Sequence, residues 1–190
     1  MARLSMSLFG VFVTVVALGM PPQGAGAALA PPRDSAVGGG EAGIFHEIFM
    51  TANSDSLGGD AGGTVSFVAE IVVGGNVARV RFAGPVTCLG VEGNRAVIGF
   101  LGPIGPMKVL AVDNGATGSP ADGFGVSVLA TDCSNETGVG THPLSTGDIA
   151  VRDVPSKAQC LAGGWRSYSD AAGQPFRNQG ECIAFALGAS

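Results

Sequence analysis

The stretch VTCLGVEGNRAVIGF, residues 86–100, decides the fold class of this chain. It predicts two short apolar strands joined by a tight turn at Glu92-Gly93-Asn94, because Gly and Asn tolerate the positive φ that such a turn requires. The first of these strands contains Cys88, one of four cysteines in the 190-residue chain. A strand–turn–strand unit of this kind is typical of an antiparallel sheet.

Similar patterns extend in both directions from this hairpin. Residues 64–73 and 77–82 alternate in polarity around Gly74-Gly75-Asn76, which predicts a second hairpin with Arg79 and Arg81 facing outward. Further short segments of β type occupy residues 44–51, 107–113, 124–131 and 147–153.

Together these segments predict a mainly β domain over residues 44–154. Their spacing indicates an antiparallel β-sandwich or barrel of about eight strands, and the 32 glycines fit its many turns. No segment between them has the pattern of a crossover helix, which argues against a parallel α/β fold. In residues 44–51, strict alternation would place Phe45 and Phe49 on one face and Ile48 and Met50 on the other. Several strands are apolar on both faces, among them residues 65–73, which fits burial from two sides.

The N-terminus has the layout of a secretory signal. Arg3 precedes an uncharged apolar run over residues 4–20, and Pro21-Pro22 and small residues follow it. We expect a signal peptide over residues 1–27, with cleavage after Ala27 or Ala28, and a flexible Pro- and Gly-rich leader over residues 28–43. An uncleaved membrane anchor is the alternative, although the run is shorter than the roughly 20 residues of a span. The mature chain is therefore expected to be secreted, extracellular and monomeric.

The charge of the chain disfavours a nucleic-acid partner. Its net charge is −5, and loss of Arg3 with the signal makes it −6 (−5 − 1). Phosphate binding needs clustered Lys and Arg, whereas the basic residues here are scattered. We expect an unknown extracellular or cell-envelope partner, no nucleic acid, and no membrane contact after signal removal.

After residue 154 the character of the sequence changes. Ser156 is a good helix N-cap, and Gly163-Gly164 predicts the end of a first helix. Pro175 predicts the start of a second helix over residues 176–187. Residues 155–190 therefore form a small helical appendage, too short to bury a core without a covalent staple or a dock on the β domain.

An even number of cysteines in an exported chain predicts disulfide bonds. Three connectivities are possible for Cys88, Cys133, Cys160 and Cys182, and no pair has the C-x-x-C spacing of a zinc ribbon or a redox dithiol. A bridge between Cys160 and Cys182 would close a loop of about twenty residues and contribute about 3 kcal/mol.

Two parts of the chain resemble known sequences. Residues 160–165, CLAGGW, and residues 176–185, FRNQGECIAF, resemble a C-terminal motif of many uncharacterised proteins exported by high-GC bacteria. Residues 43–154 are similar to the post-COAP β module, through segments such as Val86-Thr87-Cys88-Leu89, Phe124-Gly125-Val126-Ser127 and Gly147-Asp148-Ile149. The second resemblance implies an extracellular β module without known catalysis, and it implies a Cys88–Cys133 bridge.

The sequence carries no strong catalytic or metal-binding pattern. His46 and His142 belong to no H-x-H or H-E-x-x-H motif, and no G-x-S-x-G elbow is present. Two sets of loop oxygens, residues 113, 114 and 122 and residues 53, 55 and 60, could hold calcium, but turn capping is the favoured interpretation. Trp165 and Tyr168 are interpreted as the core of the appendage rather than as a carbohydrate platform. We therefore predict no catalytic residue, no metal and no cofactor.

Three functions remain open on these grounds. The leading hypothesis is a secreted non-enzymatic module for extracellular interaction or envelope association. A carrier of a small apolar ligand in a β-barrel pocket is the second. A secreted hydrolase, whose triad would form only in space, is the third.

Overall fold

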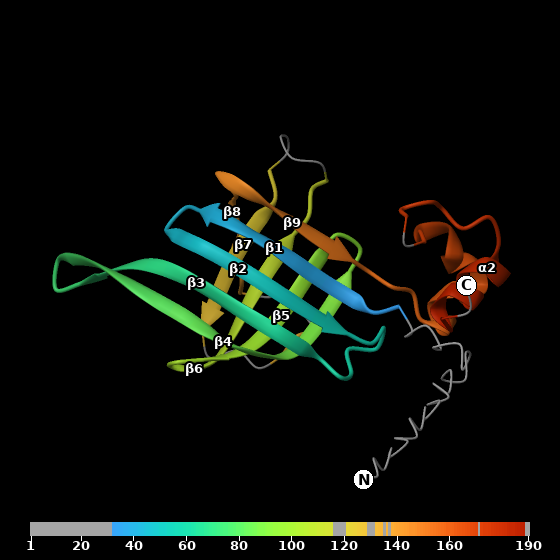
Figure 1. Ribbon diagram of the computed structural model, residues 1–190, viewed down its shortest axis with the longest axis horizontal. Coiled ribbons are helices and arrows are strands. Elements are labelled where there is room, and N and C mark those ends of the chain that lie inside the picture. Colours follow the sequence, from blue (N-terminus) through green and yellow to red (C-terminus); the bar gives the residue numbers. More distant parts are fainter. Residues whose placement is uncertain are drawn as a thin grey trace, which may run out of the picture.

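The computed structural model describes residues 32–115, 121–128, 132–134, 136, 138–170 and 172–188. The predicted signal peptide and residues 28–31 lie outside this part of the chain. Nine antiparallel strands form one sheet in the order β8-β7-β6-β5-β4-β3-β2-β1-β9, which curls into a half-barrel (Figure 1). Its strands are β1 (Asp34–Ala42), β2 (Phe45–Ser54), β3 (Gly62–Val73), β4 (Asn76–Glu92), β5 (Arg95–Gly102), β6 (Gly105–Val112), β7 (Gly123–Val128), β8 (His142–Pro143) and β9 (Thr146–Arg152). The predicted mainly β antiparallel fold is confirmed.

The predicted flexible leader is wrong from residue 34 onward. Strand β1 lies inside the sheet, between β2 and β9, and pairs with both of them. Its glycines permit close packing rather than flexibility. A Cβ at Gly38 would overlap the main-chain carbonyl of Asp148, and a Cβ at Gly39 would overlap that of Ile48. The Gly-rich composition suggests a linker, but these glycines are needed because a side chain would not fit between β1 and its neighbouring strands β2 and β9.

Strand β4 connects the two halves of the sheet. It pairs with β3 through residues 76–85 and with β5 through residues 86–92. The segments 77–82 and 86–91, predicted as separate strands, are thus one continuous strand. Both predicted turns are confirmed, since Val73 pairs with Asn76 and Glu92 pairs with Arg95.

The concave face of the half-barrel is filled with aromatic side chains. Phe67 is 1 % exposed and lies within 5.2–6.2 Å, between ring centroids, of four other phenylalanines: Phe45, Phe82, Phe100 and Phe124. The alternation predicted for residues 44–51 is wrong, because a bulge between His46 and Phe49 brings Phe45, Ile48 and Met50 to the same buried face. Glu47, within this bulge, has a φ of 48°.

Aspartate side chains hold the outer edge of β9. Asp122 Oδ2 accepts a hydrogen bond from Ile149 N at 2.7 Å, and Asp113 Oδ2 accepts one from Val151 N at 3.0 Å. Both amides point away from β1, so the two carboxylates take the place of a tenth strand. The curl of the sheet brings β6 and the β6–β7 connection against β9, and these bonds close that side.

Two disulfides complete the structure. Cys88 on β4 is bonded to Cys133, with a Cα–Cα distance of 6.1 Å, and Gly99 packs directly against both sulfur atoms. Cys160 is bonded to Cys182 in the appendage. The bridge implied by the post-COAP resemblance and the staple considered for the appendage are therefore both present.

The appendage consists of α1 (Lys157–Cys160), the 3-10 helix η1 (Leu161–Ser167) and α2 (Gln179–Ala186). Ser156 caps α1 as predicted, in a capping box with Gln159. The second helix begins later than predicted, because Asn178 is its N-cap. Pro175 instead forms an isolated β-bridge with Ser169. The buried residues Cys160, Cys182 and Phe176 form the centre of this small core.

Candidate functional site

The most prominent surface feature is the end of the β3–β4 hairpin. It projects beyond the half-barrel, on the side away from the helical appendage (Figure 1). Residues 71–77 are all exposed, and four of them are large aliphatics, with exposed fractions from 37 % to 73 %: Ile71, Val72, Val73 and Val77. For residues 71–73 the sequence predicts burial, because both faces of that strand are apolar. The structure shows an unpacked aliphatic tip, defined here as residues 71–77.

Burial on two faces does occur elsewhere in the sheet. On β6, Val109 faces the main core, whereas Leu110 and Val112 pack with Val97 in a second cluster on the convex side. Cys133 and Val139 lie against this second cluster. The apolar pattern that is buried in β6 is thus left in contact with solvent at the aliphatic tip.

Behind the tip, the convex face of β1–β4 carries an outer charged cluster of Glu41, His46, Glu47, Glu70, Arg79 and Arg81. Arg79 lies directly opposite Glu70 and donates to its Oε1 from Nε at 3.1 Å and from Nη2 at 2.9 Å. Arg81 pairs with Glu47, which the β2 bulge turns toward it. Glu47 has a positive φ, a conformation that lowers folding stability by about 1 kcal/mol or more in a non-Gly residue.

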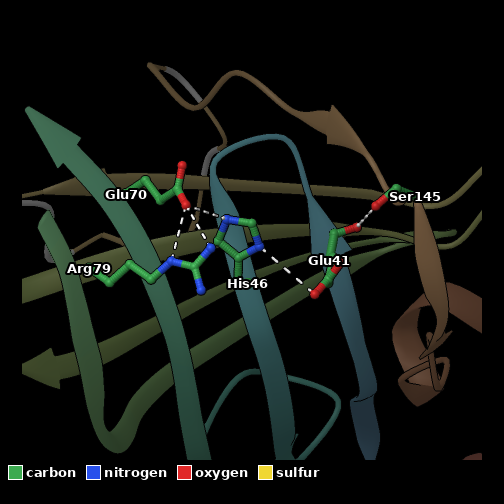
Figure 2. Close-up of polar contacts among 5 residues, drawn as sticks. All are labelled: Glu41, His46, Glu70, Arg79 and Ser145. Carbon is green, nitrogen blue, oxygen red and sulfur yellow. Dashed lines mark hydrogen bonds and ion pairs between the residues drawn. The ribbon is translucent and has the colours of Figure 1, made fainter. Parts of the chain in front are cut away.

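His46 lies at the centre of the outer charged cluster. Its Nε2 is 3.4 Å from Glu70 Oε1, and its Nδ1 is 3.8 Å from Glu41 Oε1 (Figure 2). Nε2 is buried and, among the described residues, has no hydrogen-bond partner. The main-chain oxygen of Glu41 accepts hydrogen bonds from Ser145 N and Oγ, so this cluster also joins β1 to the start of β9.

The chemistry open to this cluster is limited by its neighbours. The polar groups around His46 are carboxylates, and Glu70 Oε1 is already shared with Arg79. No group of three or more His, Cys, Asp or Glu side chains in the described part of the chain is placed to hold a metal ion. His142 lies apart from His46, with its ring against Phe45 at 5.8 Å between centroids. The arrangement is a largely exposed ion-pair network that links β1, β2, β3 and β4 at the base of the hairpin.

Three aspartates of the two sets of loop oxygens accept hydrogen bonds from backbone amides. Asp55 Oδ1 caps Leu57 N and Gly59 N, and Asp113 Oδ1 caps Gly115 N. Asp122 Oδ1 accepts from Asn114 N at 2.8 Å. Turn capping is therefore confirmed for these aspartates. Sequence reasoning did not find the second bonds of Asp113 and Asp122, to β9, because they join residues 38 and 27 positions apart.

A group of carboxylates lies where the β domain meets the appendage. Asp34 is 5 % exposed, and its Oδ1 accepts from Val154 N at 2.7 Å. Burial, with smaller contributions from the charges of Asp153 and Asp55, raises its pKa to about 6 against the opposing Val154 hydrogen bond. Burial also raises the pKa of Asp153, although that carboxylate accepts from Gly93 N. Desolvation and the nearby charges of Asp153, Asp34 and Glu92 raise the pKa of Tyr168.

The two unusual aromatics of the appendage serve its packing. Trp165 and Tyr168 are partly buried against the core of Cys160, Phe176 and Cys182. The Arg166 guanidinium lies 4.5 Å from the centre of the Trp165 ring. Both aromatics thus pack on the core of the appendage, as predicted, while each remains partly exposed.

In comparisons with known proteins, no family model, curated protein or solved structure matches the chain. Within the described residues, no helix is both long and apolar enough to cross a membrane.

Proposed function

We propose that the chain is a secreted, non-enzymatic interaction module that uses its β3–β4 hairpin to contact an extracellular or cell-envelope partner. The observation that carries this proposal is the aliphatic tip, which extends from a sheet whose strand β4 is held by the Cys88–Cys133 disulfide. Exposed aliphatic surface on a rigid element is typical of a binding site. The two disulfides and the signal-like N-terminus support export.

The other two functions have weaker support. The concave face, where a carrier would hold its ligand, is occupied by tightly packed phenylalanines. For a hydrolase, the polar neighbours of His46 are glutamates, and His142 packs edge to face against the Phe45 ring. Neither arrangement favours these alternatives.

Affinity capture tests the proposal. The purified mature chain is immobilised and exposed to cell-envelope fractions and culture fluid of the source organism. A V72T/V73T/V77T variant replaces the three most exposed aliphatics of the tip while keeping β-branched residues. A V37T/V128T variant makes the same change at two other exposed valines, which are 46 % and 52 % exposed.

We expect a specific partner to be retained by the wild type and by V37T/V128T but to be lost with the tip variant. Equal capture by all three chains would contradict a role for the hairpin. Turnover of ester, peptide or glycosidic substrates, abolished by one point substitution, would contradict the non-enzymatic assignment.

A further inference from the structure

One edge of β4 is unpaired along the hairpin. Residues 76–85 pair with β3 on one side, but β5 begins to pair with β4 only at Val86. At that point the Leu101 carbonyl lies against Gly84, and the β5–β6 turn then leads the chain away. Among the described residues, no strand pairs with the second edge of residues 76–85.

The register of the hairpin shows which backbone groups face this edge. In a hairpin with a two-residue loop, the flanking residues Val73 and Asn76 form a hydrogen-bonded pair, and bonded and non-bonded pairs then alternate. Val77, Arg79 and Arg81 therefore point their N–H and C=O groups away from β3. The bond from Glu70 N to Ile44 O, 3.0 Å long on the opposite side of the ribbon, agrees with this register.

The side chains of the same three residues share the convex face. Arg79 and Arg81 are 67 % and 56 % exposed at their side chains, and Val77 is 66 % exposed. The pair with Glu70 uses Nε and Nη2 of Arg79, which leaves further N–H groups of the guanidinium for a second carboxylate. Every second residue along this edge therefore presents a side chain on the convex face, in the order Arg81, Arg79 and Val77.

Two other occupants fit this edge less well. Insertion of the hairpin into lipid would bury its open backbone groups in hydrocarbon, where each unsatisfied group costs several kcal/mol. A second copy of the chain, paired antiparallel edge to edge in the registers centred on Arg79, Val80 or Arg81, would place Arg79 or Arg81 opposite an arginine of the other copy. Like charges directly opposite each other destabilise a strand pair.

We propose that the free edge of β4 binds an extended peptide segment of the partner as an added antiparallel strand. Residues opposite Arg81, Arg79 and Val77 would follow the pattern acidic-x-acidic-x-aliphatic, because side chains of one face recur every second residue. The inference rests on the proposed function and specifies the chemistry of its partner.

The test uses the mature chain and a fluorescent, end-capped peptide, Thr-Glu-Thr-Glu-Thr-Val-Thr, in a titration followed by anisotropy. A matched peptide is N-methylated at both Glu and at Val, whose amides would donate to β4. A third peptide carries Lys in place of both Glu. We expect the first peptide to bind saturably and N-methylation to weaken it at least about tenfold, through loss of its edge hydrogen bonds.

An E70R/R79E exchange keeps the cross-strand ion pair but reverses the charge at residue 79, one of the two cations on the edge. It should weaken the Glu peptide roughly tenfold and strengthen the Lys peptide. The same exchange at the Arg95–Glu136 pair, R95E/E136R, lies away from the hairpin and should change neither affinity.

Several results would overturn the inference. These are equal binding of the N-methylated peptide, equal effects of the two exchanges, a dimer of the mature chain in sedimentation, or tip-dependent binding to anionic vesicles with no peptide binding. A partner still captured through the aliphatic tip by E70R/R79E would leave the proposed function standing and refute only this edge. Failure of the wild type to capture any partner would instead refute the proposed function.

Discussion

The outer edge of β9 and the free edge of β4 differ in whether their backbone amides have hydrogen-bond partners. The outer edge of β9 has its amides at Ile149 and Val151 bonded to the carboxylates of Asp122 and Asp113. The edge of β4 along the hairpin has arginine side chains above it and no such caps among the described residues. Open edges are a liability that proteins normally cover or blunt. The molecule covers one edge with aspartates, so the other is better explained as a surface kept for binding.

The largest expected effect comes from removing the cap of β9. Asp122→Ala deletes the acceptor of both Ile149 N and Asn114 N at a site that is 6 % exposed. Hydrogen bonds to a charged group contribute about 1.5–3 kcal/mol each, so the free energy of unfolding should fall by roughly 3–6 kcal/mol. Urea denaturation measures this change. Asp148→Ala, on the same strand but exposed, should stay within about 0.5 kcal/mol of wild type.

A third aspartate on the closed side is expected to lower stability at neutral pH. The pKa of Asp34 is raised to about 6 from 3.8, so the folded chain binds a proton that the unfolded chain has already lost between these values. The contribution of this group to stability is therefore greatest below pH 4 and falls as the pH rises through 6. The full difference amounts to about 3 kcal/mol.

Asp34→Asn keeps an oxygen acceptor for Val154 N and removes the buried charge. We expect the variant to gain stability over wild type at pH 7 and to lose this advantage at pH 4, in urea titrations at both pH values. An advantage of equal size at pH 4 and pH 7 would show that Asp34 does not titrate in this range.

Hydrogen exchange compares the two edges directly. The amides of Ile149 and Val151 donate to carboxylates, whereas those of Val77, Arg79 and Arg81 face the open edge. Exchange at the β9 amides should be slower by roughly 10- to 100-fold, the range expected from one charge-assisted hydrogen bond. Similar protection of both sets in the isolated chain would mean that the β4 edge is already covered.

The strands and turns could be predicted from the sequence, but the neighbours that each strand packs against could not. Alternation and Gly-Asn turns follow from local chemistry, so both hairpins and the fold class could be predicted. Whether Gly38 and Gly39 are solvated or pressed between two strands depends on neighbours far along the chain. The same holds for Asp122. Nearby residues alone predict only turn capping for its side chain, and they give no sign of its bond to β9.

The candidate site was missed for a related reason. The apolar run Ile71-Val72-Val73 followed by Gly74-Gly75 is visible in the sequence, but its two apolar faces predict burial. Only the register shows that β2 stops pairing with β3 at Ala69 and that β5 starts pairing with β4 at Val86. How far a hairpin extends beyond its neighbouring strands depends on tertiary pairing, so no local sequence pattern predicts it.

The smallest expected effect concerns the ion pair at the base of the hairpin, and it separates recognition from stability. Arg79 and Glu70 are 67 % and 34 % exposed at their side chains, so their coupling energy in a double-mutant cycle with Arg79→Gln and Glu70→Gln should be only about 0.2–1 kcal/mol. Chemical denaturation of the four chains gives this value. A coupling of several kcal/mol would mean that Arg79 is needed to hold the ribbon together, and loss of peptide binding on its substitution would then report damage to the hairpin. With the small value expected, the arginines on the β4 edge contribute little to the fold, and their position there is better explained by a partner.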